Sequence, residues 1–483
     1  MVQHNSANSI AHINASPTKT FFVEMLTRDI ELEDAILDLL DNCVDGIQRI
    51  TKDEQSSTNP YNNFWAKITF SNENFRIEDN CGGIPKEVAE EYAFKMGRPT
   101  NVKNNIDRDV YTIGTYGIGM KRSIFKIGRS AEVISQTANE SFKVTIHPEW
   151  LTRDNDWDLP FETISCSSEI NGTSITVTSL YEGISEEFLS SKSTLLDRLI
   201  TKISRYYSFI LHKGFTVTVN GKNVIPKSWS LLWGGSEQLA KESIIAPYLY
   251  KAQSNDVDVR LAIGFYRSMP GENEIEGEIN GTKRRSEEAG WTIVCNDRVV
   301  VYCDKTLLTG WGETTIPRFH AQFIGISGIV EFRSKDSKKL PITTTKRGID
   351  ASSDIYLYVK NFMREGLKYL TSYINKWRID IVEEKKRSEQ AYPINPDDLF
   401  EGDIIPREKW TPVRNRSYES KYIPALPLPM NTRGKKALNK NIKFSKSLQE
   451  IKLLAEFLFE DSERDPSEVG EECFERTLKE AQK

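Results

Sequence analysis

The sequence predicts an α/β protein in which two mixed α/β domains are followed by a small helical module. Apolar residues recur at helical spacing within residues 29–50. Short runs rich in β-branched and aromatic residues alternate with such helices over residues 64–380. Two helix start signals occur within residues 441–483. A chain of 483 residues is long enough for two or three domains with separate cores.

Composition limits the function classes. Hydrophobic residues make up 38% and charged residues 28% of the chain, as in ordinary globular proteins. The net charge of −5 argues against a protein that only coats nucleic acid. Without an apolar run near eighteen residues or a secretory-type N-terminus, we expect a cytoplasmic protein with no membrane span. The six cysteines lack C-x-x-C spacing, which favours reduced thiols over disulfides or zinc.

Residues 21–222 are expected to form the first domain, after a polar arm over residues 1–20. Its long first helix, over residues 29–50, turns one apolar side toward a core. That apolar side consists of Ile36, Leu39, Leu40, Cys43 and Ile47. The elements expected after it are strands over 64–70 and 74–77, a polar lid-like stretch over 97–112, a short helix over 121–126, strands over 131–136, 142–147 and 174–179, a long helix over 186–212, and a strand and turn over 215–221.

Residues 223–380 are expected to form a second α/β domain. Strands are expected over 257–265, 291–302 and 323–332, and a closing helix over 353–377. The core side of that helix is expected to be Leu357, Phe362, Leu367, Leu370 and Ile374.

The remaining sequence divides into a linker and a tail. Residues 381–440 are rich in charge and proline, which indicates a linker or draped loop. Residues 441–483 are expected to form two short helices. Ser447 and Glu450 form a capping box before the first, and Asp465 caps the second, ahead of Pro466.

Four polar residues share one face of the first long helix. Asp38, Asp41, Asn42 and Asp45 are spaced i, i+3, i+4 and i+7, opposite the apolar side. A solvated acidic face is the simpler explanation. However, asparagine is a mediocre helix residue, and its oxygen is a ligand suited to Mg²⁺. A carboxylate one turn earlier is placed to accept a proton from an attacking water.

A second motif follows a strand. Asp79 stands at the strand end, and Gly82 and Gly83 allow the backbone to approach a ligand closely. A buried carboxylate there accepts a hydrogen bond from an exocyclic amine such as that of adenine. The alternative is a simple Asp-Asn-Cys-Gly-Gly turn.

The third motif is glycine-rich. Gly114, Gly117 and Gly119 precede a helix bearing Lys121 and Arg122, so free N–H groups and the positive helix end would face an anion. The spacing fits neither a Walker A loop nor a dinucleotide fingerprint. Glycine-rich turns without phosphates are common, so this motif alone is not decisive.

Taken in order, these segments resemble the GHKL superfamily, which includes DNA gyrase, heat-shock chaperones, histidine kinases and MutL. The segment from Ile113 to Ser123 most closely resembles the microrchidia (MORC) type and related bacterial ATPases. The resemblance covers about residues 20–380. It implies a Bergerat-type ATP-binding domain, a two-layer α+β sandwich, followed by a transducer-like α/β domain. ATP and Mg²⁺ are the implied ligands.

The resemblance also implies roles for individual residues. Asn42 would hold Mg²⁺ and Asp79 would read adenine, while Met96 and Gly97 would begin the lid. The remaining implied ATP-binding positions are Gly83 in the base pocket, Gly114, Gly117, Gly119 and Lys121 around the phosphates, and Thr173 on the adenine side.

Two catalytic residues follow from the resemblance. The general base of the family is Glu, whereas this chain has Asp38, which is one methylene shorter and suggests slow hydrolysis. Cys81 replaces the first glycine of the second motif. Lys346 lies in a loop where the transducer domain returns a basic residue to the γ-phosphate, with Arg347 as the reserve candidate.

The implied function is an ATPase that drives an ATP-gated dimer clamp or conformational switch. A kinase is disfavoured because only His4 and His12 precede the motifs. The target stays open between DNA, through basic islands at 283–285 and 433–446, and a protein partner bound by the proline-rich segment and tail helices. A bacterial anti-phage or restriction-linked setting fits this type of ATPase. The alternative is a nucleotide-gated scaffold or chaperone-like module that binds ATP with little or no hydrolysis.

Overall fold

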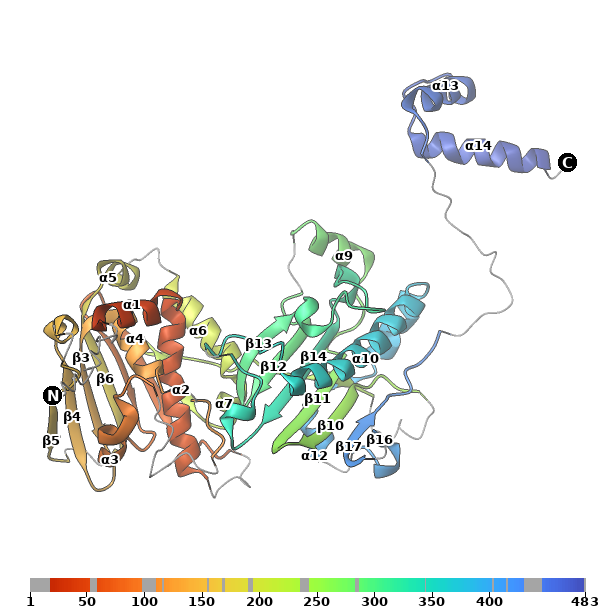
Figure 1. Ribbon diagram of the computed structural model, residues 1–483. Helices are drawn as coiled ribbons and strands as arrows, with labels where there is room; N and C mark the ends of the chain where they lie inside the picture. The colour runs from red at the N-terminus through yellow and green to blue at the C-terminus, as the bar shows by residue number, and fades with distance from the viewer. Residues whose placement is uncertain are drawn as a thin grey trace, which may run out of the picture. The chain divides into compact units, whose positions relative to one another are not determined.

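The chain forms two compact units, Met1–Pro429 and Met430–Lys483, in the computed structural model. The structure describes residues 18–52, 59–97, 110–114, 117–153, 156–166, 170–189, 194–234, 243–282, 286–343, 345–401, 404–413, 416–429 and 445–481. The first unit contains two large sheets, which follow one another in the sequence (Figure 1).

The first sheet has eight strands in the order β5-β4-β3-β6-β2-β1-β7-β8. Only β1 and β7 are parallel neighbours, and the other pairs are antiparallel. The strands are β1 (Trp65–Phe70), β2 (Phe75–Asp79), β3 (Gly128–Gln136), β4 (Ser141–Ile146), β5 (Phe161–Ile164), β6 (Gly172–Leu180), β7 (Thr216–Val219) and β8 (Lys222–Asn223).

Helices form a second layer against this sheet (Figure 1). The expected apolar side of residues 29–50 is confirmed, because all five of its residues are buried in the shared core. The helical elements are α1 (Lys19–Arg28), α2 (Leu32–Ile50), α3 (Lys86–Val88) with a π-helical turn (Ala89–Ala93), α4 (Gly119–Ile127), a 3₁₀ turn (Pro148–Thr152), α5 (Glu182–Leu189), α6 (Leu195–Tyr206) and α7 (Ser208–His212). The two-layer α/β sandwich is therefore confirmed.

One helix prediction for this region was wrong. The long helix expected over 186–212 is three helices, α5, α6 and α7. Between α6 and α7, Tyr207 leaves helical geometry (φ −113°, ψ 14°), and its buried hydroxyl bonds back to α2 at the Leu37 carbonyl oxygen, 2.7 Å away. Helix α1 begins at Lys19, inside the expected arm, because that ammonium group is buried over the Trp150 ring and bonds its carbonyl oxygen.

The second sheet has seven strands in the order β13-β12-β14-β11-β10-β17-β16. Helix α10 covers one face, and a two-stranded sheet of β9 and β15 contributes to the core on the other. The elements are β9 (Leu231–Trp233), β10 (Tyr248–Ser254), β11 (Val257–Phe265), α9 (Glu272–Ile279), β12 (Gly290–Cys295), β13 (Arg298–Asp304), β14 (Ile326–Arg333), α10 (Asp354–Trp377), α11 (Ile381–Ser388), β15 (Tyr392–Ile394), α12 (Pro396–Glu401), β16 (Thr411–Val413) and β17 (Arg416–Tyr422), with 3₁₀ turns at Leu307–Thr309, Ala321–Phe323, Ser337–Lys339 and Arg407–Lys409.

The single strand expected over 291–302 is instead a hairpin of β12 and β13. Asn296 and Asp297 form its tight turn with φ angles of 46° and 66°. These two residue types tolerate the left-handed region better than other non-glycine residues, so they end one strand and start the next. The hairpin packs against α6 and α7, which brings it close to α2.

Two further expectations for the second sheet need correction. Leu357 is 49% exposed, so it does not belong to the core side of α10, whereas the other four residues named for that side are buried. Residues 381–422, expected as linker, contain α11, α12 and three strands, and β17 pairs with β10. An open edge of β10 explains why this proline-rich stretch is ordered there. The domain boundary at 222/223 stays a prediction.

The second unit contains α13 (Leu448–Phe459) and α14 (Pro466–Ala481). The expected capping box is present, since Ser447 and Glu450 each bond the other's backbone N–H group. Asp465 accepts a bond from the Ser467 N–H at 2.8 Å, as expected for the start of α14. Among the described helices, none combines the length and apolar character needed to cross a membrane.

Candidate functional site

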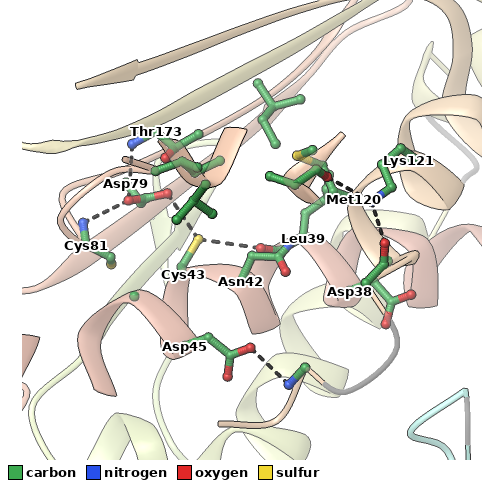
Figure 2. Close-up of a pocket in the computed structure, with 18 of the residues that line it drawn as sticks. Asp38, Leu39, Asn42, Cys43, Asp45, Asp79, Cys81, Met120, Lys121 and Thr173 are labelled. Atoms are coloured by element: carbon green, nitrogen blue, oxygen red, sulfur yellow. Dashed lines mark hydrogen bonds between the residues drawn. The ribbon is translucent and has the colours of Figure 1, made fainter. Parts of the chain in front are cut away.

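One cavity of about 170 Å³ brings the sequence motifs together. Figure 2 shows Asp79 and Thr173 at one end of it, Asp38 and Lys121 at the other, and Asn42 between. Met96 does not line the cavity and instead packs, partly buried, against the apolar core. The other ten predicted site residues all line it: Asp38, Asn42, Asp79, Gly83, Gly114, Gly117, Gly119, Lys121, Thr173 and Lys346.

Asn42 is exposed, although its helix is otherwise buried on nearly every side. Residues 32–41 and 43–48 of α2 are all buried, and Asn42 is the one exposed residue between them. It lines the cavity together with buried neighbours on the same helix, among them Asp38 and Leu39. Among the described residues, no group of three or more His, Cys, Asp or Glu could hold a metal ion. The amide oxygen of Asn42 is a hard donor at the exposed face of the cavity, which suits Mg²⁺ bound mainly through phosphates and waters.

Asp79 closes one end of the cavity from the last position of β2. Its Oδ1 accepts hydrogen bonds from the N–H groups of Cys81 (2.8 Å) and Thr173 (3.3 Å). Burial raises the pKa of this carboxyl to about 6, against the lowering effect of those bonds. Its Oδ2 is 3.4 Å from the Cys43 sulfur, so this oxygen lies toward the thiols of the pocket.

Cys81 fits where the related family has glycine. Its side chain is buried against α2, and the Cys43 and Cys81 thiols contact each other. That mutual contact and burial raise the pKa of Cys43, and burial raises that of Cys81. Both thiols are therefore protonated at neutral pH, and all six cysteines are free.

Gly83 is a position that only glycine can fill. Its φ is +72°, and a Cβ there would lie 2.2 Å from the Gln136 carbonyl oxygen. The β3 backbone therefore approaches the glycine turn directly, which fixes the turn at the cavity wall.

Asp45 holds the third motif against α2, a role that the sequence did not reveal. Its carboxylate accepts bonds from the N–H groups of Ile113 (2.7 Å) and Gly114 (2.9 Å). A Cβ at Gly114 would lie 2.6 Å from Asp45 Oδ2, which explains the glycine. Of the expected lid over 97–112, residues 98–109 lie outside the described residues.

Lys121 projects from the first turn of α4 into the cavity region while almost completely buried. Its ammonium group donates to the carbonyl oxygens of Ala93, at 2.8 Å, and Gly117. No carboxylate of the described residues pairs with it, and burial lowers its pKa to about 7. Within the described residues, the Lys121 amine is therefore held only by carbonyl oxygens, and an anionic ligand would favour its charged form.

Asp38, the expected base, is paired with Arg122 from α4. Arg122 follows Lys121 in the first turn of α4, the helix whose free N–H groups and positive end are expected to face an anion. The Asp38 Oδ1 atom also lies 3.7 Å from the Lys346 ammonium nitrogen.

Lys346 reaches the cavity from the loop between β14 and α10. Its backbone adopts φ +55°, which is uncommon for a non-glycine residue, and its side chain is 11% exposed. Its ammonium group donates to Asp41 Oδ2 at 2.9 Å. Burial opposes its charge, but Asp41, Asp38 and Asp45 raise its pKa. The reserve candidate, Arg347, pairs with Asp34 and does not line the cavity.

Asp41 joins Lys346 to a second cation, Arg298, which no sequence pattern singles out. Arg298 Nε donates to Asp41 Oδ1 at 3.0 Å. Burial alone would raise the pKa of Asp41, but Lys346 and Arg298 hold it below its usual value. The carboxylate is therefore ionised.

Comparison with known proteins supports a nucleotide site here. Residues 30–178 match the family model described as "Histidine kinase-, DNA gyrase B-, and HSP90-like ATPase". No curated protein matches the chain. The match spans the three motifs that line the cavity, while the loop of Lys346 lies beyond it. Residues 30–178 are thus similar to GHKL-type ATPase domains, which supports ATP binding within a GHKL fold.

Proposed function

We propose that this chain is a slow Mg²⁺-dependent ATPase in which the γ-phosphate acts as a conformational signal to the second sheet. The observation that most supports this is the single cavity lined by residues from α2, the Asp79 turn, the glycine motif, β6 and the Lys346 loop. The match to the ATPase family supports the same nucleotide independently.

The two ends of the cavity bind different parts of ATP. The Asp79 carboxylate accepts a hydrogen bond from the exocyclic amine of adenine, and Gly83 and Thr173 border the base. Lys121 and the N–H groups of the glycine motif bind the phosphates. Magnesium, held through the Asn42 oxygen, supplies charge neutralisation for the phosphates when bound.

Hydrolysis requires a base and a cation at the γ-phosphate. Asp38 accepts a proton as the water oxygen forms its bond to the γ-phosphorus and the bond to the β–γ bridging oxygen breaks. Lys346 stabilises the charge on the transferred phosphoryl group. Because Lys346 belongs to the second sheet's part of the chain, the γ-phosphate ties the two parts together until it leaves.

We extend this to an ATP-gated homodimer clamp of the MORC-like type. In it, two ATP domains associate when ATP is bound, and hydrolysis reopens the pair. The basic islands proposed for DNA, 283–285 and most of 433–446, lie outside the described residues. A protein target is favoured by the exposed apolar side chains of the second unit, including Leu453 (74%) and Phe457 (77%).

A nucleotide-gated scaffold is the second candidate. The ion pair between Arg122 and Asp38 favours it, because the carboxylate oxygen that Arg122 contacts is not open to an attacking water. The two candidates share the binding site and differ only in turnover.

Calorimetry and phosphate release test the proposal. We expect the purified chain to bind ATP more tightly with Mg²⁺, and Asn42→Ala to lose that gain. Asn361→Ala is the matched control, an exposed helical asparagine on α10 outside the cavity. No binding heat from wild-type protein would contradict the proposal, whereas binding without phosphate release would select the scaffold.

A further inference from the structure

A buried carboxylate joins two cations beside the cavity. Asp41 is 1% exposed and does not itself line the cavity. Its Oδ2 accepts from Lys346, and its Oδ1 accepts from Arg298 and from the Tyr207 hydroxyl at 2.6 Å. Both oxygens thus accept hydrogen bonds from outside α2. The donors are Tyr207, which follows α6, Arg298 on β13, and Lys346 in the loop before α10.

Arg298 is itself rigidly held. It is the first residue of β13, directly after the Asn296-Asp297 turn. Its guanidinium donates to the carbonyl oxygens of Tyr206 (3.2 Å) and Val299 (2.8 Å) and lies 4.2 Å from the Tyr207 ring centre. A fixed guanidinium fixes the carboxylate that it binds.

The Lys346 side chain is positioned by α2 and not by its own loop, because the carboxylates near its ammonium group are Asp41 and Asp38. A lysine side chain has four rotatable bonds, and holding it in one rotamer costs conformational entropy. The bond to Asp41 selects the rotamer in which the ammonium group lines the cavity. Since an ammonium group has three N–H donors, one bond to Asp41 leaves others for a phosphate.

We propose that Asp41 is the positioning residue for Lys346, holding its ammonium group at the γ-phosphate position, and that Arg298 in turn fixes Asp41. The inference rests on the proposed function. Asp41 acts through Lys346 and touches neither nucleotide nor metal. It also gives the second sheet two routes to the site, one through the Lys346 loop and one through the Arg298 side chain at the start of β13.

The competing explanation is that Asp41 only stabilises the junction as a buried ion pair. The chain offers a matched comparison at the same junction. Asp297 is equally buried, and it pairs with Lys213 at 2.6 Å and accepts a bond from the Tyr61 hydroxyl at 3.2 Å. It does not contact Lys346, so a purely structural role predicts the same behaviour for both carboxylates.

The test is a double-mutant cycle in the full chain with ATP and Mg²⁺. We expect Asp41→Asn and Lys346→Met each to lower kcat by on the order of tenfold or more, with KM changed less than about threefold. The double variant should be no slower than Lys346→Met, because Asp41 acts through that lysine. Asp297→Asn should destabilise the fold yet change kcat little. Combined with Lys346→Met, its effect on kcat should be independent, so that the two fold-changes multiply.

Other outcomes separate this inference from the proposed function. The positioning role would be overturned, while ATPase activity stands, if the effects of Asp41→Asn and Lys346→Met on kcat multiplied. It would also be overturned if Asp297→Asn lowered kcat as much as Asp41→Asn. A Lys346→Met variant as fast as wild type would overturn it as well. If Asp41→Asn does not fold, Arg298→Met is used in the same cycle, with the same expectation. Absent ATP binding by wild type would instead reject the proposed function.

Discussion

Arg122 of α4 donates a hydrogen bond to the carboxylate of Asp38 on α2, and the two side chains are 8% and 4% exposed. The pair joins the helix of the glycine motif to the helix of Asn42. It also places an arginine where the proposed water-activating carboxylate must receive a proton. The catalytic rate therefore depends on how far this ion pair leaves the carboxylate free to act as a base.

We predict that Asp38→Asn abolishes hydrolysis while preserving ATP binding. The amide keeps the size of the side chain but cannot accept the proton, so kcat should fall by on the order of a hundredfold or more. Phosphate release measures the rate, and calorimetry measures the affinity.

Arg122→Met is the companion variant, since it retains the Asp38 carboxylate but removes its partner. We expect it to keep measurable turnover, with a lower unfolding temperature because a buried charge loses its pair. An Asp38→Asn variant that hydrolyses ATP at the wild-type rate would exclude Asp38 as the base.

The second prediction concerns pH and adenine recognition. Burial raises the pKa of Asp79 to about 6, so the carboxylate is ionised above that pH and protonated below it. Because Oδ1 already accepts from the N–H groups of Cys81 and Thr173, protonation places the hydrogen on Oδ2. That oxygen then becomes a donor and no longer suits the adenine amine. Affinity for ADP should therefore weaken as pH falls from 7.5 to 5, as titration calorimetry would detect.

Asp79→Asn provides the control for this pH effect. It should bind ADP weakly at every pH and lose the decline near pH 6. A decline that persists in Asp79→Asn would mean that another group causes it.

Most of the features that the sequence predicts correctly depend on residues that are close together in the chain. The apolar spacing of α2, the Ser447–Glu450 capping box and the glycine turns depend on neighbouring residues, and the structure contains each of them. The Asn42 position also follows from helical spacing, because Leu40, two residues earlier and on the other side of α2, is buried in the core and does not line the cavity.

Contacts between distant residues could not be predicted in this way. Arg298 and Asp41 are 257 positions apart, and no spacing rule connects them. The break at Tyr207 has the same origin, because its hydroxyl bonds α2. The Asn296-Asp297 turn did carry a local signal, two residues that tolerate positive φ, which a purely apolar reading of residues 291–302 overlooks.

The third prediction is proton uptake when ATP binds. Burial lowers the pKa of Lys121 to about 7, so at pH 8 about nine-tenths of the free protein carries this amine uncharged. Polyphosphate favours the charged form, so binding at pH 8 should take up close to one proton, and at pH 6 almost none. Calorimetry in buffers of different ionisation enthalpy counts these protons.

Lys121→Met should remove this uptake, and Lys376→Met, at an exposed position of α10, should leave it unchanged. Equal uptake in wild type and Lys121→Met would show that the proton goes to another group. Protons that ATP itself takes up or releases on binding are counted equally in wild type and variant, so they cancel in the difference.

The last prediction separates folding from binding with two glycines of the cavity. Gly83→Ala should destabilise the fold, because φ is +72° and the new Cβ would lie 2.2 Å from the Gln136 carbonyl oxygen. Strain of this kind costs on the order of 1–3 kcal/mol, which thermal unfolding would register as a lower midpoint. At Gly119, by contrast, a Cβ meets only Asp38 atoms at 3.6 Å, an ordinary contact.

Gly119→Ala should therefore keep or raise the unfolding midpoint, since alanine is a better helix residue at the start of α4. Its methyl group adds bulk at the wall where the phosphates are proposed to approach the backbone, so ATP affinity should fall while the fold stays intact. If Gly119→Ala bound ATP as tightly as wild type, the phosphates would have to lie away from the first turn of α4. That result would move the proposed phosphate site toward Gly114 and Gly117, and leave the adenine end unaffected.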